Sequence, residues 1–153
     1  MLLPSCPLCQ APQAGTLIWQ NQHLRVVWGL EPDHPCLVRV VWQAHVSEMC
    51  ELSPEEQLAL MQAVFAVEAA MKRVLAPKKL NLASLGNAVP HLHWHIVPRW
   101  ENDAHWPFSI WAPAQRGACS TGVDLKPFLA QAIACALEAL HPSRRSVHST
   151  RVI

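Results

Sequence analysis

The chain has 153 residues, of which 51% are apolar, 15% are charged and nine are histidines, with a formal net charge of +1. A chain of this length and composition can build one core without disulfide bonds, which excludes an extensively disordered protein. Its nearly neutral charge, with no basic run longer than Arg144-Arg145, argues against DNA or RNA polymers as partners and leaves a small phosphorylated ligand open.

The sequence predicts a cytoplasmic protein without a membrane segment. Residues 1–9 lack the charged and then apolar pattern of a signal peptide, and no apolar run approaches the roughly 20 residues that cross a bilayer. In a reducing compartment the six cysteines are not expected to form disulfide bonds, and paired cysteines there indicate a metal more than a disulfide.

The first half of the chain reads as an irregular lead-in followed by strands. Prolines and Gly15 make residues 1–15 irregular. Apolar runs predict strands over 17–19 and 24–28, joined by a turn at Asn21-Gln22, and a third strand over 37–42, where β-branched residues favour strand over helix.

The strongest helix signal follows. Ser53 can cap the helix, Pro54 suits its first position, and Glu56 completes a capping box with Ser53. One apolar stripe then recurs at steps of three and four residues, until Pro77 ends the helix: Leu60, Val64, Val67, Met71 and Val74.

The second half continues with short strands and a last helix. Strands are predicted over 80–85 and 91–97, the latter stopped by Pro98, then a long loop over 102–122 and a helix over 124–140. We expect a single α+β domain over residues 1–142, with an antiparallel sheet and helices on one face, and a flexible tail over 143–153.

The informative motif is His91-Leu-His93-Trp-His95-Ile-Val97. On a strand, alternate side chains share a face, so the three imidazoles point one way while Leu92, Trp94 and Ile96 point the other. Burying three polar rings is costly unless each finds a partner. An exposed strand face that carries histidines by chance is the alternative, because the chain is rich in this residue.

A chemical role fits the motif better. A neutral imidazole is a nitrogen nucleophile near neutral pH, and its attack on phosphorus gives a phosphoramidate that water can break. The attacking ring must be held in one tautomer, with donors facing the developing charge. A strand with histidines at every second position supplies an attacking ring flanked by two donors.

This pattern resembles the signature of the histidine-triad (HIT) superfamily, which alternates histidine and apolar residues and matches His91 to Val97 at every position. Residues 86–90 resemble the loop that leads into the triad. The resemblance covers roughly residues 16–100 and implies a HIT-like sheet of about five antiparallel strands with one long helix and a C-terminal helix. It also implies a homodimer.

The same resemblance implies roles for individual residues. His93 would be the nucleophile and His95 would contact the phosphate and assist the leaving group. Gly86 and Asn87 would hold phosphate oxygens, with Asn81 and His91 as further substrate contacts. The implied substrates are nucleoside phosphoramidates or dinucleoside polyphosphates, and no organic cofactor is expected.

Two features depart from the family pattern. The loop before the triad is short and lacks the usual glycine cluster, and Ala88 replaces a hydroxyl residue that often contacts phosphate. Asn81 or Ser84 are candidates to compensate. The sequence does not decide the substrate or its base. It also does not decide whether the acceptor is water or another group.

The pair Cys6 and Cys9 has zinc-knuckle spacing, although two reduced cysteines in a flexible lead-in are the simpler interpretation. By resemblance to zinc-bearing relatives, Cys6, Cys9, His45 and His91 would form a closed structural zinc site. A rival arrangement places a catalytic zinc on His93 and His95, for which no third ligand is evident outside the triad.

Other residues have less distinctive settings. The sequence predicts core positions for Trp28, Trp42 and Trp94. Two further tryptophans are expected either to line a bound base or to anchor their own loop: Trp106 and Trp111. Asp103 and His105 are candidates to approach the ligand, whereas His23 and His34 are expected to face solvent. The four remaining thiols are interpreted as packing residues: Cys36, Cys50, Cys119 and Cys135.

The leading hypothesis is therefore a nucleotidyl hydrolase or transferase that works through a nucleotidyl-histidine intermediate on His93. Two alternatives from other classes stay open: a non-catalytic nucleotide sensor with the same fold, which Ala88 and the short loop make credible, and a zinc-stabilised interaction module. Nucleotide binding without product would indicate the sensor, and metal content without nucleotide affinity would indicate the module.

Overall fold

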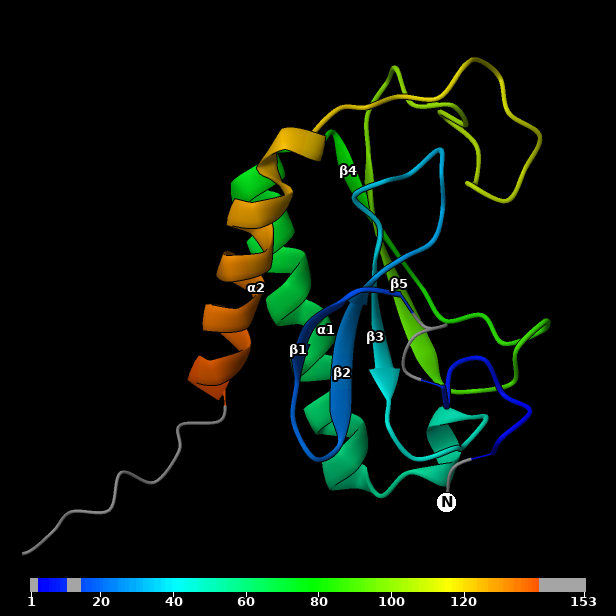
Figure 1. The fold of residues 1–153 in the computed structure, drawn as a ribbon, viewed down its shortest axis with the longest axis vertical. Coiled ribbons are helices and arrows are strands. Elements are labelled where there is room, and N and C mark those ends of the chain that lie inside the picture. The colour runs from blue at the N-terminus through cyan, green and yellow to red at the C-terminus, as the bar shows by residue number, and fades with distance from the viewer. Residues whose placement is uncertain (1–2, 11–14, 141–153) are drawn as a thin grey trace, which may run out of the picture.

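A five-stranded antiparallel sheet in the order β1-β2-β3-β5-β4 forms the centre of the molecule (Figure 1). The computed structural model describes residues 3–10 and 15–140, so the predicted tail over 143–153 lies outside the described residues. The strands are β1 (Leu17–Gln20), β2 (Leu24–Trp28), β3 (Val38–Trp42), β4 (Lys79–Ala83) and β5 (His93–Arg99). The predicted fold class is confirmed.

The turn between β1 and β2 depends on one side chain. Asn21 Oδ1 accepts hydrogen bonds from the backbone N–H groups of His23 and Leu24 at 2.9 and 2.8 Å. This local bonding is why asparagine favours turns, and it places the hairpin where the sequence predicted it.

The long helix α1 (Pro54–Leu75) begins and ends as its sequence predicts. Ser53 Oγ accepts from the Glu56 N–H at 3.2 Å, and the Glu56 carboxylate accepts from the Ser53 N–H at 2.9 Å. Ala76, with φ of 45°, ends the helix in the left-handed conformation just before Pro77. After a 3-10 turn (Val123–Leu125), helix α2 (Lys126–Leu140) follows.

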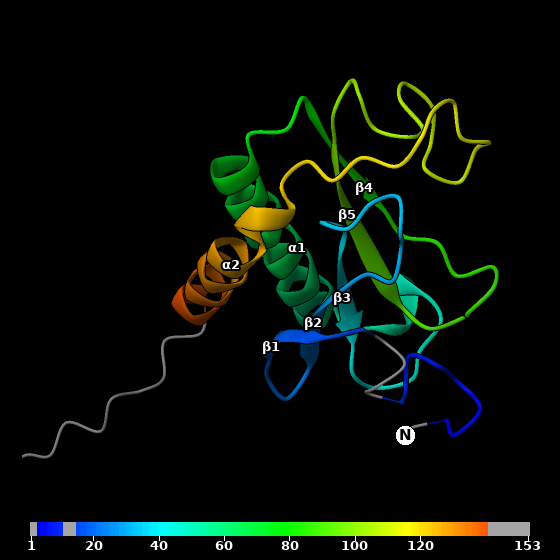
Figure 2. The same cartoon turned by 45° about the horizontal axis from the view of Figure 1, so that its top comes forward.

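Both helices cover the same face of the sheet, as Figures 1 and 2 show. The core lies between them, because alternate residues of each strand point toward the helices. It includes the following buried side chains: Leu24, Val26, Val38, Val40, Ile96, Leu60, Val64, Met71, Leu129 and Ile133. The opposite face carries a smaller cluster of Cys6, Leu8, Cys9, Val27 and Val41. Loops gather on that side of the sheet, as Figures 1 and 2 show.

The bounds of β1 and β3 differ from the prediction by one residue, and those of β4 and β5 differ more. β4 covers 79–83 instead of 80–85, and β5 covers 93–99 instead of 91–97. Pro98 was expected to stop β5 but lies within it, paired with Leu80. The register between β3 and β5 ends at Ile96, so β5 has only β4 as a neighbour at Pro98. Proline is tolerated at such an edge position, since no second ladder needs its N–H.

Several single-residue expectations are settled by burial. Trp42 is buried, Trp28 and Trp94 pack partly buried against the core, and His23 is exposed, as predicted. His34 was expected to face solvent, which is wrong: it is buried against His105. Of the four thiols interpreted as packing residues, one is buried and one half-buried (Cys36, Cys119), but two are exposed (Cys50, Cys135). Among the described residues, neither helix has the length and apolarity that crossing a bilayer requires.

Candidate functional site

His93 is held in a single tautomer on the open face of the sheet. Its Nδ1 lies 2.6 Å from the backbone carbonyl oxygen of His91. A carbonyl can only accept a hydrogen bond, so Nδ1 carries the proton and Nε2 keeps its lone pair. His93 is only 7% exposed, and its Nε2 is the ring nitrogen that can act as a nucleophile.

His95 stands beside His93 on the same strand face. The two Nε2 atoms are 3.0 Å apart, and the rings meet edge to face with centroids 4.7 Å apart. Because His93 Nε2 has no proton, His95 Nε2 must donate this hydrogen bond. His95 Nδ1 is buried without a hydrogen-bond partner among the described residues. The pair therefore combines one bare nitrogen with one N–H donor.

Burial keeps both rings neutral. It lowers the pKa of His93, against the opposing effect of the His91 carbonyl, and the nearby Arg39 guanidinium adds to the lowering. Burial also lowers the pKa of His95, to about 3, with further contributions from His93 and Arg39. A neutral imidazole is the form that can attack an electrophile.

His91 precedes β5 and belongs to a different cluster. Its Nε2 donates to the Trp42 carbonyl at 2.6 Å, which leaves Nδ1 bare. That Nδ1 lies 3.4 Å from Cys6 Sγ, 3.5 Å from Cys9 Sγ and 3.3 Å from His45 Nδ1. The structure thus brings together the four residues of the expected metal site, mostly buried.

The spacing of these four side chains fits a tetrahedral metal. Zinc–nitrogen bonds near 2.0–2.1 Å and zinc–sulfur bonds near 2.3 Å place tetrahedral ligand atoms about 3.3 to 3.8 Å apart. The Cys9 Sγ–His45 Nδ1 distance is 3.4 Å, in the same range. The carbonyl behind His91 fixes its tautomer for a ligand role. Burial raises the pKa of the Cys9 thiol, an effect that a bound cation opposes.

A cavity of about 440 Å³ opens over the histidine pair. It is lined by Pro7, Leu8, Glu31, Arg39, Leu85, Asn87, Ala88, Val89, His93, His95 and Trp111. Asn87 lines this cavity, and Gly86 precedes it in the same loop without lining the cavity. Pro7 and Leu8 come from between the two cysteines, so the sulfur cluster builds one wall of the cavity. Ala88 contributes no hydroxyl there.

Some predicted residues lie outside the cavity. The Asn81 side chain is occupied elsewhere, because its Oδ1 accepts from Arg99 Nη1 at 2.9 Å. Ser84 comes closer, donating from Oγ to the His93 carbonyl at 3.0 Å. Asp103 and His105 were candidates to approach the ligand, but both are buried in a network at the base of the following loop. They do not line the cavity.

Three charged residues near the site were missed by the sequence argument. Arg39 and Glu31 line the cavity and form an ion pair at 2.8 Å. Arg25 lies near Cys6 and Cys9 and is buried, with Nε and Nη2 unpartnered among the described residues. For Arg25 and Arg39 the available signal was a charged residue inside an apolar strand, on the same face of the sheet as the histidines; Glu31 lies in the loop between β2 and β3 and has no such signal.

The sequence model of the HIT domain matches residues 11–102, more than half of the chain. The chain belongs to the HIT domain family. The match includes His45 and all three triad histidines, whereas Cys6 and Cys9 precede it. The family assignment made from the motif is confirmed.

Two curated relatives are moderately similar in sequence. The AP-4-A phosphorylase of Mycobacterium tuberculosis is 29% identical over 113 residues, covering 67% of this chain and 58% of the relative. The asymmetrical bis(5'-nucleosyl)-tetraphosphatase of Schizosaccharomyces pombe is 32% identical over 97 residues, covering 60% of this chain and 53% of the relative. The chain therefore spans a little over half the length of these enzymes.

Solved HIT structures share the fold. A histidine triad protein from Bradyrhizobium japonicum superposes with a TM-score of 0.66 at 27% identity, covering 85% of this chain and 92% of that one. A zinc-bound histidine triad family protein from Mycobacterium smegmatis superposes with a TM-score of 0.58 at 20% identity, covering 89% and 95%. The second likeness concerns the fold alone.

Proposed function

We propose that this HIT protein is a nucleotidyl hydrolase or transferase that cleaves dinucleoside polyphosphates or nucleoside phosphoramidates through a nucleotidyl-histidine intermediate on His93. One observation carries the proposal. The His91 carbonyl fixes the proton of His93 on Nδ1, so that the bare Nε2 lies in a cavity next to an N–H donor, His95 Nε2.

In the first step, the Nε2 lone pair of His93 attacks the phosphorus of the nucleotidyl group. The new P–N bond forms as the bond to the leaving group, a bridging oxygen or an amine nitrogen, breaks with its electron pair. His95 Nε2–H is placed to donate a hydrogen bond to that leaving group and to stabilise the negative charge that develops on it; a phosphate departs as the anion, and an amine takes its proton from water. The Nδ1–H bond to the His91 carbonyl steadies the positive charge that develops on the His93 ring.

In the second step, an acceptor breaks the P–N bond. The acceptor attacks phosphorus and gives up its proton to solvent, while the electron pair of the P–N bond returns to Nε2 and releases His93 as a neutral ring. His95 keeps its Nε2 proton throughout. Water as acceptor gives hydrolysis, and inorganic phosphate gives phosphorolysis. The two curated relatives carry names of these two kinds, which supports dinucleoside polyphosphates as substrates and leaves the acceptor to experiment.

We also propose that Cys6, Cys9, His45 and His91 hold a structural zinc ion. The distances fit a tetrahedral site, and two thiolates balance the charge of a divalent cation. The metal would fasten residues 3–10 to the start of β5 and leave no ligand position for water. A catalytic zinc on His93 and His95 is disfavoured, because their Nε2 atoms are joined by a hydrogen bond and no third ligand lies with them among the described clusters.

Trapping the intermediate tests the enzymatic proposal. The protein is mixed with diadenosine tetraphosphate, quenched within the first turnover and digested for mass spectrometry. We expect an adenylyl group on the peptide that contains His93, and none in the His93→Ala variant. Turnover in the presence and absence of inorganic phosphate identifies the acceptor. Tight nucleotide binding with neither adduct nor product would contradict the enzymatic proposal and favour the sensor.

The predicted homodimer and the cytoplasmic location stay predictions.

A further inference from the structure

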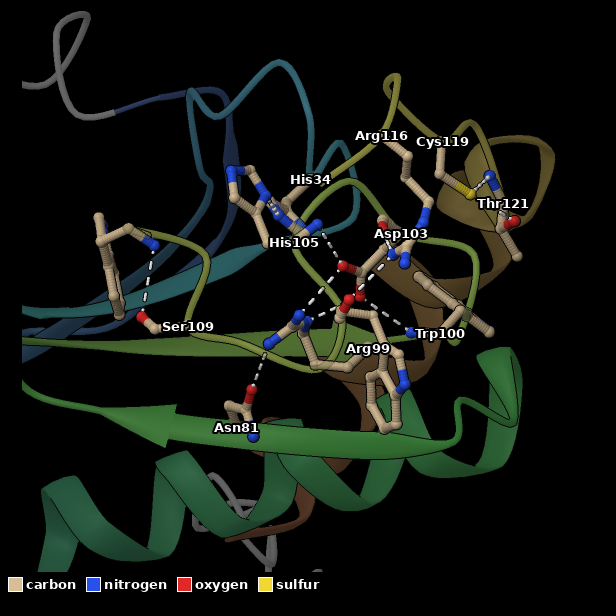
Figure 3. A network of polar contacts seen from close by, with 12 residues as sticks. His34, Asn81, Arg99, Trp100, Asp103, His105, Ser109, Arg116, Cys119 and Thr121 are labelled. Atoms are coloured by element: carbon tan, nitrogen blue, oxygen red, sulfur yellow. Dashed lines mark hydrogen bonds and ion pairs between the residues drawn. The ribbon is translucent and has the colours of Figure 1, made fainter. Parts of the chain in front are cut away.

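A buried polar network holds the base of the loop between β5 and α2 (Figure 3). Arg99 Nε and Nη2 donate to the two carboxylate oxygens of Asp103 at 2.7 and 3.0 Å. The same carboxylate accepts from the backbone N–H groups of Trp100 and His105 at 3.1 and 2.9 Å. These bonds fix the direction in which the chain leaves the sheet.

One further contact ties this loop to the loop between β2 and β3: His34 Nε2 and His105 Nδ1 share a hydrogen bond of 2.8 Å. Within the loop itself, Arg116 Nη1 donates to the Asp103 and Trp106 carbonyls at 2.6 and 3.0 Å. His34, Asp103 and His105 have the composition of a metal site. However, Arg99 occupies both oxygens of Asp103 and would repel a cation, so the network is structural.

The loop fixed in this way presents Trp111 to the cavity. The indole is 48% exposed, and its ring lies 5.3 Å from that of His95, edge to face. Trp106 packs against the Arg99 guanidinium at 5.9 Å and does not line the cavity. Trp106 and Trp111 were both expected either to line a bound base or to anchor the loop. In the structure Trp106 anchors the loop, whereas the half-exposed Trp111 ring lies beside His95 in the cavity.

An ion pair lies in the cavity with Trp111. Arg39 is opposite His95 in the β3–β5 register, and its Nη2 donates to Glu31 Oε1 at 2.8 Å. The pair is neutral as a whole, so it has little attraction for a phosphate group. The Glu31 carboxylate is 33% exposed and keeps acceptor capacity for hydroxyl or amino groups. These are the groups of a nucleoside.

The strand register orders the cavity along one direction. His93 is opposite Val41 and His95 is opposite Arg39, so the line from His93 to His95 runs toward Arg39. Asn87 belongs to the loop that precedes β5, at the other end. In-line attack by His93 places the leaving group opposite Nε2 and the nucleoside oxygen to one side of that axis. The end of the cavity formed by Trp111, Arg39 and Glu31 lies beside His95 and can hold the nucleoside.

We propose that Trp111, Glu31 and Arg39 form a nucleoside subsite, in which the indole stacks on the base and the Glu31 carboxylate accepts a hydrogen bond from a ribose hydroxyl. This inference rests on the proposed function, since it assumes that a nucleotide occupies the cavity. It assigns the fixed loop a role in substrate recognition, because the Arg99–Asp103 network holds the indole in place.

The base contact is tested by calorimetry with AMP and with ribose 5-phosphate, which lacks the base. Stacking of a base on an aromatic side chain corresponds to roughly 5- to 150-fold in affinity. We expect Trp111→Leu to weaken AMP binding within this range and to leave ribose 5-phosphate unchanged. Phe108→Leu is the matched control, because Phe108 is an exposed aromatic residue of the same loop outside the cavity. Equal weakening of both ligands, or unchanged AMP binding, overturns the stacking role.

The hydroxyl contact is tested with AMP and its 2',3'-dideoxy analogue. Wild-type protein is expected to prefer AMP by roughly tenfold or more, because a hydrogen bond to a charged acceptor is lost in the analogue. Glu31→Gln keeps the shape and the contact to Arg39 while removing the charge. We expect it to reduce the preference at least about fivefold. An unchanged preference removes Glu31 from the subsite.

The same variants separate the two proposals. If wild-type protein binds AMP and forms the adduct on His93, while Trp111→Leu and Glu31→Gln behave like wild type, only the subsite is wrong. If wild-type protein neither binds AMP nor forms the adduct, the proposed function itself is wrong.

Discussion

His91 and His93 lie two residues apart, yet backbone carbonyls hold them in opposite tautomers. His91 donates from Nε2 to the Trp42 carbonyl and keeps Nδ1 bare, toward two sulfur atoms and His45. His93 donates from Nδ1 to the His91 carbonyl and keeps Nε2 bare, toward the cavity. The residue type is the same, and the position of the nearest carbonyl decides which nitrogen is left for bonding.

The comparison also shows how one region supports the other. The carbonyl that holds His93 belongs to His91, whose own ring is fixed by Trp42 and by the sulfur cluster. Pro7 and Leu8, between the two cysteines, form a wall of the cavity. We therefore expect the sulfur cluster to contribute directly to the stability of the fold. We expect it to affect catalysis only indirectly, through the shape of the cavity.

The largest effect is expected from His95→Ala, which removes the proposed hydrogen-bond donor to the leaving group and leaves His93 in place. Loss of one such donor lowers kcat by about 10²- to 10³-fold for substrates with a poor leaving group. Stopped assays with an adenosine phosphoramidate measure kcat for a poor leaving group. The nitrophenyl ester of AMP has a leaving group that is stable as an anion, and kcat for this substrate should change much less.

This contrast distinguishes stabilisation of the leaving group from a loss of shape. If His95→Ala slows both substrates equally, His95 does not donate a hydrogen bond to the leaving group. The Trp111→Leu variant is a suitable control, because it alters the neighbouring ring without removing a titratable group.

Local chemistry made much of this fold predictable from the sequence. The capping box at Ser53 and the asparagine turn at Asn21 involve neighbours within three residues, so their structures follow from short-range hydrogen bonds. Strand alternation likewise placed His93 and His95 on the face away from the helices. Strand alternation does not, however, predict which ring nitrogen of His91 or His93 carries the proton. That depends on where the carbonyl groups of Trp42 and His91 lie.

The errors involve contacts between distant segments. His34 is buried because His105, 71 residues later, supplies its hydrogen-bond partner. Pro98 is tolerated in β5 because the pairing with β3 does not extend beyond Ile96, which no local sequence pattern reveals. Arg39 and Glu31 were overlooked because their role depends on a cavity that other elements enclose.

A smaller effect, on stability, is expected when the sulfur cluster is disrupted. Cys6→Ser removes one ligand of the proposed zinc site, and we expect it to lower the free energy of unfolding by about 3 kcal/mol, which corresponds to a fall in Tm of roughly 6–12 °C. Calorimetric melts measure the fall, and metal analysis of the purified protein should give one zinc per wild-type chain. Below the melting transition, kcat should change less than in His95→Ala.

The control for this variant is Cys36→Ser, which alters a buried thiol outside the cluster. Chelator treatment should lower the Tm of wild-type and Cys36→Ser proteins and leave that of Cys6→Ser unchanged. If chelation has no effect on the wild type and no metal is found, the cluster is a set of reduced thiols and the structural-zinc proposal is wrong.

The smallest effect is expected at Asp103, which lies outside both the sulfur cluster and the His93–His95 pair. Its substitution is expected to lower stability without changing the reaction at His93. Burial alone would raise the pKa of its carboxyl, but hydrogen bonds from Arg99 and from backbone N–H groups outweigh burial and hold the pKa at about 2. A carboxyl with a lowered pKa stabilises the fold above its ordinary value of 3.8, and this contribution disappears as pH falls toward 2. The shift corresponds to about 2 kcal/mol.

Denaturant unfolding of wild type and Asp103→Asn between pH 7 and pH 2 measures this contribution, because the titration of groups that do not interact with Asp103 cancels in the difference. The two free energies should differ most near neutral pH and converge by about 2 kcal/mol below pH 4. Zinc content and the His93 adduct should be the same in both proteins, whereas AMP affinity should fall as the loop that carries Trp111 loosens. A difference independent of pH would mean that the Asp103 carboxyl has an ordinary pKa, and a loss of the adduct would mean that the network reaches the reactive pair itself.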